Sequence, residues 1–232
     1  MTDHSDHCPV SDTAALVMLW AGRYYQETPL IRRYVDRLDL SLGVPLLDRY
    51  NEICPWYSEV IINRKHFIKD TVITLLKKND EKTTIINLGA GFSPLGLEIL
   101  PWLSDDVRLI ELDLRNMEAK QQLYSELAPD RVHLISCIET DLSNTDSLIK
   151  IVRENSNEQG RTHLIVVMEG LSYYIDRQVM QQVLTSFRDI SHHLTFICQL
   201  PTNKFAGLRL CTNSGHSSGW LTSHPCNSRV YL

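Results

Sequence analysis

The sequence predicts an α/β fold, in which a doubly wound, mostly parallel sheet follows a helical N-terminal segment. From about Thr83 onward, short β-branched runs alternate with longer amphipathic stretches. The runs are nearly continuous in apolar residues, as in Ile-Ile-Asn-Leu and Leu-Ile-Val-Val, which is typical of parallel strands covered on both faces. The first ~80 residues contain no such run and instead have helical periodicity.

Five runs are expected to be strands, at residues 84–88, 107–112, 132–137, 163–168 and 194–200. The amphipathic stretches between them predict helices near residues 95–103, 115–127, 147–154 and 177–190. This alternation of strand and helix indicates a doubly wound sheet.

The chain divides into three parts by pattern. Residues 1–80 are expected to form a helical lid, with helices at 13–25, 30–38 and 60–77 that Pro29, Pro45 and Pro55 punctuate. Residues 81–202 are expected to form the sheet-containing core. Residues 203–232 form a polar tail in which Gly, Ser, Thr and Asn cluster at 211–219.

Composition narrows the class of protein. The 232 residues are 43% hydrophobic and 22% charged, which is ordinary for one globular domain. A net charge of −5 disfavours a nucleic-acid partner. We find no apolar run near the ~20 residues of a membrane span and no secretory signal, so a cytoplasmic protein is expected. The six scattered cysteines are interpreted as reduced, and no spacing of Cys and His predicts a metal site.

A glycine pair follows the first predicted strand of the core. In the segment Asn-Leu-Gly-Ala-Gly-Phe-Ser-Pro, Gly89, Ala90 and Gly91 lead from the strand toward a helix. Glycine lets the backbone turn tightly and approach a ligand, while the helix offers free amide donors. The pair alone also describes an ordinary turn between strand and helix.

Acidic residues end the next strands. Glu111 and Asp113 follow the glycine pair by about 20 residues, where this fold uses a carboxylate to bind ribose hydroxyls. Strand residues alternate between faces, so both point the same way, and the pattern cannot choose between them. Asp141 and Leu142 follow the third strand, and Glu169 follows the fourth. Because ligands lie across the carboxyl ends of the strands, these positions predict one pocket.

These segments together resemble the leucine carboxyl methyltransferase family, which includes protein phosphatase carboxyl methyltransferases and bacterial O-methyltransferases of polyketide-like natural products. The matching residues are 11–15 with Arg23, 63–70, 88–92, 110–113, 140–142 and 169–174, within about residues 10–200. The resemblance implies a Rossmann-like class I methyltransferase sheet and S-adenosylmethionine as cofactor.

The resemblance also implies a role for each site residue. Arg64 pairs with the methionine carboxylate of the cofactor, which suits a guanidinium fork. Gly89 lies against the methionine moiety, and Ala90 and Gly91 of the same loop also bind the cofactor. Asp113 binds the ribose, Asp141 and Leu142 surround the adenine, and Glu169 lies near the methionine amino group.

The sequence departs from the family at three places. Ser93 replaces an acidic residue of many relatives, a lysine used by some relatives beside the cofactor carboxylate has no clear counterpart, and the final strands of the sheet are not recognisable. We therefore expect the tail not to complete the usual seven-stranded sheet. Its edge would then be left short, disordered or covered by a partner, for example in a homodimer.

The sequence thus predicts an S-adenosylmethionine-dependent methyltransferase, with a carboxylate or hydroxyl acceptor on a small molecule or a protein. No catalytic residue stands out. Tyr173 and Tyr174 belong either to the site or to the core. An NAD(P)-dependent oxidoreductase is an alternative, although Pro94 lies where a dinucleotide site has its third small residue. A cofactor-binding protein without turnover is the other, favoured by the polar tail.

Overall fold

A parallel sheet of six strands forms the centre of the described part of the chain. The computed structural model describes residues 7–156, 162–188, 190–191, 193–198 and 227–231, the last range by its backbone alone. In spatial order the strands are β5 (Ile135–Glu139), β4 (Val107–Asp113), β3 (Lys82–Leu88), β6 (Thr162–Met168), β7 (His193–Cys198) and β8 (Asn227–Tyr231). The order reverses between β3 and β6, and the ligand crevice of such sheets lies at this switch point.

The predicted strands at 84–88, 107–112 and 163–168 are confirmed. The prediction of a strand at 132–137 is wrong in its first half, where Val132–Leu134 form a 3₁₀ turn before β5. There the amides of Val132 and Leu134 donate to the carbonyls of Ala128 and Arg131 at 3.0 and 3.1 Å, so local turn bonds override the β-branched side chain. Strand β7 begins as expected, and residues 199–200 lie outside the described residues.

Helices cover both faces of the sheet. One face packs against α8 (Thr145–Asn155) and α9 (Arg177–Arg188), with Ile86 of β3 in that core. The other packs against α6 (Leu95–Ile99), α7 (Met117–Leu127) and α5 (Tyr57–Lys78), with Ile85 in that core. Neighbouring strand residues thus face opposite cores, as strand geometry requires. The predicted doubly wound arrangement is confirmed.

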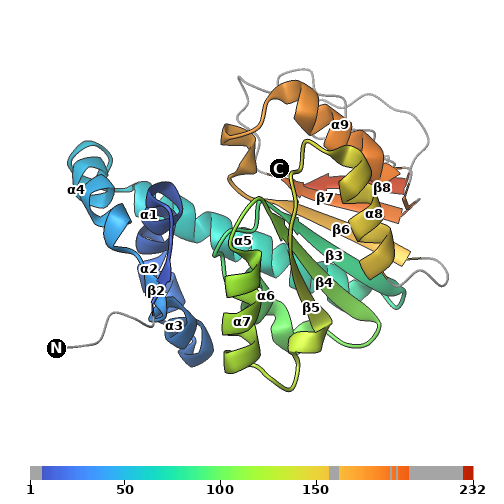
Figure 1. Ribbon diagram of the computed structural model, residues 1–232, viewed down its shortest axis with the longest axis horizontal. Coiled ribbons are helices and arrows are strands. Elements are labelled where there is room, and N and C mark those ends of the chain that lie inside the picture. The colour runs from blue at the N-terminus through green and yellow to red at the C-terminus, as the bar shows by residue number, and fades with distance from the viewer. Residues whose placement is uncertain (1–6, 157–161, 189, 192, 199–226, 232) are drawn as a thin grey trace.

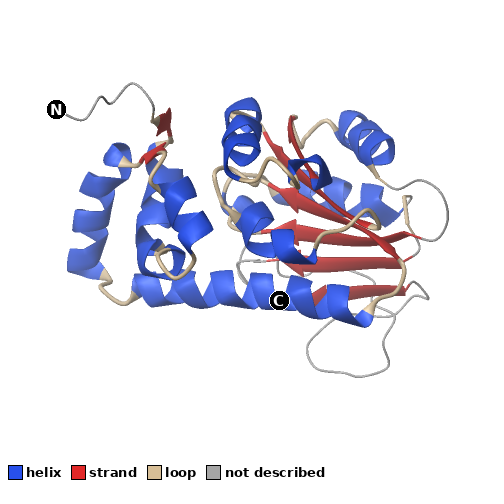
Figure 2. Ribbon diagram, turned by 90° about the horizontal axis from the view of Figure 1, so that it is seen from below, coloured by secondary structure: helices blue, strands red, loops and turns tan. Residues whose placement is uncertain are grey.

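The N-terminal region is helical, as predicted, and lies beyond one end of the sheet (Figure 1). It contains α1 (Asp12–Trp20), α2 (Gly22–Tyr25), α3 (Pro29–Val35), α4 (Val44–Ile53) and the two-residue strands β1 (Cys8–Pro9) and β2 (Leu38–Asp39). Figure 2 shows the long helix α5 extending from beneath these helices to beneath the sheet. The apolar buried residues of α1, α3 and α5 share one hydrophobic cluster with the sheet, so the N-terminal helices are packed onto the sheet-containing part of the chain.

Helix α4 was not expected from the sequence. None of its residues is fully buried, and only Leu46 and Leu47 pack partly buried against the core, which leaves a weak signal of helical periodicity. Pro45 lies in its first turn, where proline is tolerated because that N–H has no intrahelical partner. Pro45 therefore marks the start of a helix, as Pro29 does in α3.

The tail contributes a strand that the sequence did not predict. Residues Asn227–Tyr231 pair with β7 in parallel, with Phe196 opposite Val230. Residues 203–226, which carry the rest of the expectation about the tail, lie outside the described residues. No helix among those described has both the length and the hydropathy needed to cross a membrane.

Candidate functional site

A cavity of about 860 Å³ lies at the carboxyl ends of the strands, between the sheet and the N-terminal helices. Its size is typical of ligand sites. All eight residues that the sequence singled out line it, although five separate segments supply them: Arg64, Gly89, Ala90, Gly91, Asp113, Asp141, Leu142 and Glu169. The sequence therefore identified a set of residues that the fold brings together.

The glycine loop has a backbone that favours glycine. Gly89 and Gly91 have φ of 66° and 44°, in the left-handed region. A Cβ on Gly89 would lie 2.8 Å from Leu171 Cδ1, so a side chain there would clash as well as strain the backbone. The loop is tied to the end of β4, because the Gly91 amide donates to Asp113 Oδ2 at 2.8 Å. The turn thus holds Asp113 beside the glycine backbone.

The structure separates the two acids of β4. Asp113 lines the cavity and accepts hydrogen bonds from the amides of Gly91 and Leu114, the second at 2.7 Å. Glu111 is fully buried and is not among the residues that line the cavity. The geometry therefore favours Asp113 as the acid that could meet a ligand, the choice that the pattern alone left open.

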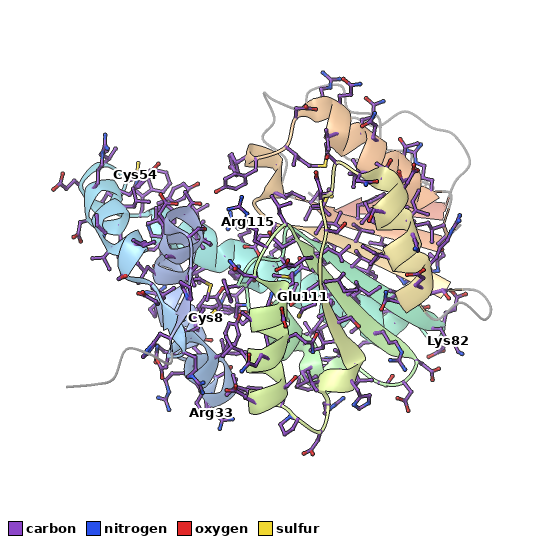
Figure 3. The ribbon with its side chains drawn as sticks, viewed as in Figure 1. Cys8, Arg33, Cys54, Lys82, Glu111 and Arg115 are labelled. Carbon is purple, nitrogen blue, oxygen red and sulfur yellow. The ribbon has the colours of Figure 1, made fainter. Side chains whose placement is uncertain are left out.

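Glu111, labelled in Figure 3, instead anchors a buried polar cluster. Its Oε2 lies 2.7 Å from Lys120 Nζ, and both side chains have no exposed surface. Asn87 Nδ2 donates to Oε1 at 3.0 Å, and the Tyr124 hydroxyl donates to Oε2 at 3.1 Å. Burial, and next the Glu111 carboxylate, raise the pKa of the Cys137 thiol, so this cysteine stays protonated.

Three charged side chains, Arg64, Lys65 and Glu169, form an ion cluster that lines the cavity beside the glycine loop. Arg64 Nε donates to Glu169 Oε1 at 2.9 Å, and Lys65 Nζ donates to Glu169 Oε2 at 2.9 Å and to Ser93 Oγ at 3.1 Å. Burial raises the pKa of Glu169, but Lys65 and then Arg64 outweigh it and hold the pKa below its usual value. Glu169 is thus an ionised carboxylate between two cations.

Lys65 was missed by the sequence analysis. It is 4% exposed and lines the cavity next to Arg64. A signal was present, because Lys65 falls on the apolar stripe of α5 between Ile61 and Ile68, with helical spacing. A lysine on a buried face needs a counter-charge, which Glu169 supplies.

The segment after β5 offers one polar and one apolar side chain. Asp141 is exposed, and its Oδ1 accepts hydrogen bonds from the Ser143 hydroxyl at 2.7 Å and the Ser143 amide at 2.9 Å. These bonds lower the pKa of Asp141. Leu142 is buried, and it still lines the cavity.

Tyr173 and Tyr174 line the cavity and are 54% and 70% exposed. The alternative that they pack the core is therefore wrong. Gly170, at φ 71°, turns the chain out of β6 and into the short 3₁₀ turn Leu171–Tyr173. Leu171 packs against the hydrophobic cluster that α9 covers and lies next to Gly89, so this segment is held over the strand ends.

None of the described lining residues is a histidine or a cysteine. The buried Cys198 thiol has a pKa raised by burial, so it offers no thiolate. The arrangement can bind and orient charged and apolar groups, which suits chemistry that depends on positioning.

Known structures share this fold. A crystal structure of a candidate methyltransferase from Thermobifida fusca YX matches with a TM-score of 0.55 and 14% identity, covering 78% of this chain and 63% of that one. A DUF574 family protein from Streptomyces avermitilis MA-4680 matches with a TM-score of 0.54 and 14% identity, over 78% and 65% of the two chains. This chain thus spans less than two thirds of either protein. The likeness confirms the predicted Rossmann-like methyltransferase fold.

Sequence comparison identifies the family. No curated protein matches the chain significantly. The family model described as leucine carboxyl methyltransferase matches residues 39–188, which include α5, the glycine loop, both acids of β4 and Glu169. Since the match covers more than half of the sequence, the chain belongs to the leucine carboxyl methyltransferase family.

Proposed function

We propose that this protein is a methyltransferase that takes its methyl group from S-adenosylmethionine and transfers it to an oxygen of its acceptor. The observation that carries the proposal is the ion cluster of Arg64, Lys65 and Glu169 beside the glycine loop. The amino-acid end of the cofactor has one carboxylate and one ammonium group. Two cations and one carboxylate, largely shielded from water, match that pair of charges.

The remaining lining residues fit the rest of the cofactor. The backbone of the glycine loop, which is open at the Cβ position of Gly91, would face the methionine chain, Asp113 would bind the ribose hydroxyls, and Asp141 with Leu142 would surround the adenine. The Gly91 and Leu114 amides occupy both oxygens of Asp113, so its carboxylate is held in one orientation. A fixed acceptor loses little freedom when a hydroxyl binds to it.

When bound, the cofactor supplies a methyl group, which forms a C–O bond with the acceptor as the C–S bond breaks and its electron pair goes to sulfur. The protein's part is to align the acceptor oxygen with the methyl–sulfur bond, and positioning can lower such a barrier by about 7–11 kcal/mol. A carboxylate acceptor is ionised at neutral pH, and a hydroxyl acceptor gives its proton to water. The absence of histidine among the described lining residues supports a mechanism based on positioning.

Calorimetric titration with S-adenosylhomocysteine and with NADH tests the proposal. We expect the first to bind and the second not to, because Pro94 follows the loop where a dinucleotide site has a small residue. Tighter binding of NADH would replace the proposal with an oxidoreductase. Binding without methyl transfer to any acceptor would leave a cofactor-binding protein.

We expect Asp113→Asn to weaken S-adenosylhomocysteine binding about 10-fold, because hydrogen bonds to a charged group contribute about 1.5–3 kcal/mol. The amide keeps the shape of the side chain but turns one of the two oxygens that accept from the Gly91 and Leu114 amides into a donor, so the thermal midpoint should fall by the loss of about one hydrogen bond. Calorimetry with adenosine alone should show the same loss. Asp146→Asn is the control, since Asp146 is an exposed carboxylate of α8 outside the cavity. Equal affinities of Asp113→Asn and wild type would remove Asp113 from the site.

We expect Lys65→Met to make cofactor affinity depend on pH. Glu169 has a lowered pKa, so its charge is present above that pKa and is lost as pH falls through it. Burial raises the pKa of Glu169, and without Lys65 the group that opposes this rise is mainly Arg64. Glu98 and the hydroxyl of Tyr25 also face the Glu169 carboxylate, but neither of them carries a positive charge. The pKa of Glu169 then rises, and the loss occurs at higher pH.

The measurement is the S-adenosylhomocysteine dissociation constant from about pH 8 to about pH 6, a range over which Glu169 of the wild type stays ionised. Affinity should fall toward acid in Lys65→Met and stay level in the wild type, with Lys65→Arg close to wild type. Lys69→Met is the control, because Lys69 lies one turn along α5 over the Tyr24 ring, outside the cavity. A level profile in Lys65→Met would show that Lys65 does not keep Glu169 charged.

A further inference from the structure

Part of the cavity is lined by residues that are not assigned to the cofactor groups discussed above. It lies between the N-terminal helices and the segment after Glu169. Its prominent side chains come from α1, α4, α5 and the turn after β6, and we call them the aromatic wall: Trp20, Tyr50, Tyr57, Tyr173 and Tyr174. The aliphatic side chains of Val17, Ile61 and Val179 line the same part of the cavity.

Three rings of the aromatic wall are joined by direct contacts, in which Trp20 packs against Tyr50 and Tyr57. Trp20 lies 4.8 Å from Tyr57 and 5.3 Å from Tyr50 between ring centroids, the second pair edge to face at 78°. At the mouth, Tyr50, Tyr173 and Tyr174 are 43%, 54% and 70% exposed. Large exposed aromatic side chains around a concavity mark a binding site for an apolar ligand. Ring edges and faces of this kind favour a further aromatic ring.

The charges near the wall argue against an anionic acceptor. Arg64 and Lys65 pair with Glu169 and are assigned by the proposed function to the carboxylate of the cofactor, and Arg115, labelled in Figure 3, follows β4 two positions after Asp113. The side chains of the aromatic wall and the three aliphatic side chains beside it carry no charge, and Asp176, which lines the same cavity, is a carboxylate. An acceptor carboxylate packed against these side chains would lose water and find no counter-charge among them, at a cost of several kcal/mol.

The tyrosine hydroxyls supply polar contacts without charge. Burial, and next the neighbouring Tyr173, raise the pKa of Tyr57, which stays neutral near neutral pH. A neutral phenol both donates and accepts a hydrogen bond, so it can orient an acceptor hydroxyl. The wall is thus apolar in area, neutral in charge and able to make hydrogen bonds.

We infer that the acceptor is an uncharged aromatic ring system that carries a hydroxyl group, bound by the aromatic wall; this inference rests on the proposed function. The ring packs among Trp20, Tyr57 and Tyr173, and the hydroxyl oxygen lies toward the glycine loop, where the methyl group is delivered. A protein C-terminal carboxylate does not fit this part of the cavity.

Three probes of similar size test the inference: 2-naphthol, 2-naphthoate and the saturated alcohol decahydro-2-naphthol. Each is titrated by calorimetry into the full chain, with and without S-adenosylhomocysteine, and each is assayed for methyl transfer from labelled S-adenosylmethionine. We expect 2-naphthol to bind at least 10-fold more tightly than the other two and to be the one that is methylated. Equal or tighter binding of 2-naphthoate would overturn the inference, and so would equal binding of the saturated alcohol.

A matched pair of variants locates the site. Tyr173→Ala removes an exposed ring of the wall and should weaken 2-naphthol binding about 10-fold while cofactor affinity stays within about two-fold. Phe67→Ala removes a ring of 46% exposure on α5 that does not line the cavity, and it should leave both affinities unchanged. Equal effects of the two substitutions on 2-naphthol would overturn the placement.

The outcomes separate the inference from the proposed function. If S-adenosylhomocysteine fails to bind while 2-naphthol binding remains sensitive to Tyr173→Ala, the proposed function is wrong and the aromatic site stands. If the cofactor binds and 2-naphthoate is methylated in preference to 2-naphthol, the proposed function stands and the inference about the acceptor is wrong.

Discussion

Replacement of Glu111 by glutamine should destabilise the protein by about 3–5 kcal/mol, a large part of the stability of a domain. Glu111 and Lys120 form an ion pair at 2.7 Å with no exposed surface on either side chain. Glutamine would leave the Lys120 ammonium buried without a counter-charge. It would also turn one acceptor oxygen into a donor among groups that already donate, the Asn87 amide and the Tyr124 hydroxyl.

Urea unfolding followed by circular dichroism measures the effect. Glu126→Gln is the control, because Glu126 lies on α7 like Lys120 but pairs with Arg37 at the surface, where such a pair contributes about 0–1 kcal/mol. The double variant Glu111→Gln with Lys120→Met removes both charges and should recover much of the lost stability. If Glu111→Gln is as mild as Glu126→Gln, or if the double variant recovers nothing, the ion pair does not stabilise the fold.

The cluster around Glu111 explains why the sequence could not decide whether Glu111 or Asp113 faces the ligand. Glu111 and Asp113 share a strand face, so hydrophobic pattern and spacing treat them alike. What separates them is a long-range contact: Lys120 arrives from α7 and Asn87 from β3 to enclose Glu111, whereas Asp113 is the last residue of β4, one position past its ladder with β3. Such pairing depends on how helices pack, and no local pattern encodes it.

The strands of the sheet were predictable, because buried parallel strands are continuous apolar runs that can be recognised in the sequence. The prediction was wrong where that signal is weak. Val132 is β-branched but lies in a turn, α4 has no fully buried residue, and β8 comes from the polar segment Asn-Ser-Arg-Val-Tyr. In each case contacts outside the segment, or local turn bonds, decide the structure.

The candidate site was predictable in its backbone and less so in its charges. Strand ends of a doubly wound sheet meet at one edge, so Gly89, Asp113 and Glu169 had to approach one another. Lys65 comes from a helix whose orientation the sequence does not give, and its partnership with Glu169 spans 104 positions in the chain. The aromatic wall gathers residues from α1, α4 and α5 with the turn after β6, an assembly that only the packed lid creates.

Replacement of Arg64 by alanine should weaken S-adenosylhomocysteine binding about 10- to 100-fold while the protein stays folded. A charge-assisted contact contributes about 1.5–3 kcal/mol, and each 1.4 kcal/mol is a factor of ten. Folding should survive because Lys65 still neutralises Glu169, with Nζ 2.9 Å from the carboxylate. Arg64→Lys should also lose affinity, since lysine keeps the charge but lacks the planar fork that holds two carboxylate oxygens at once.

The comparison that decides this prediction is between two guanidinium–carboxylate pairs of the same chain. Arg64 pairs with Glu169 in the cavity at 2.9 Å, and Arg37 pairs with Glu126 at the surface at 3.0 Å. Arg37→Ala should leave affinity for S-adenosylhomocysteine unchanged, and the loss in Arg64→Ala should shrink for adenosine, which has no carboxylate to bind. A folded Arg64→Ala protein with wild-type affinity for S-adenosylhomocysteine would refute the assignment of Arg64 to the cofactor carboxylate. An equal loss for adenosine would indicate that Arg64 shapes the cavity as a whole, because only a direct ion pair requires the carboxylate to be present.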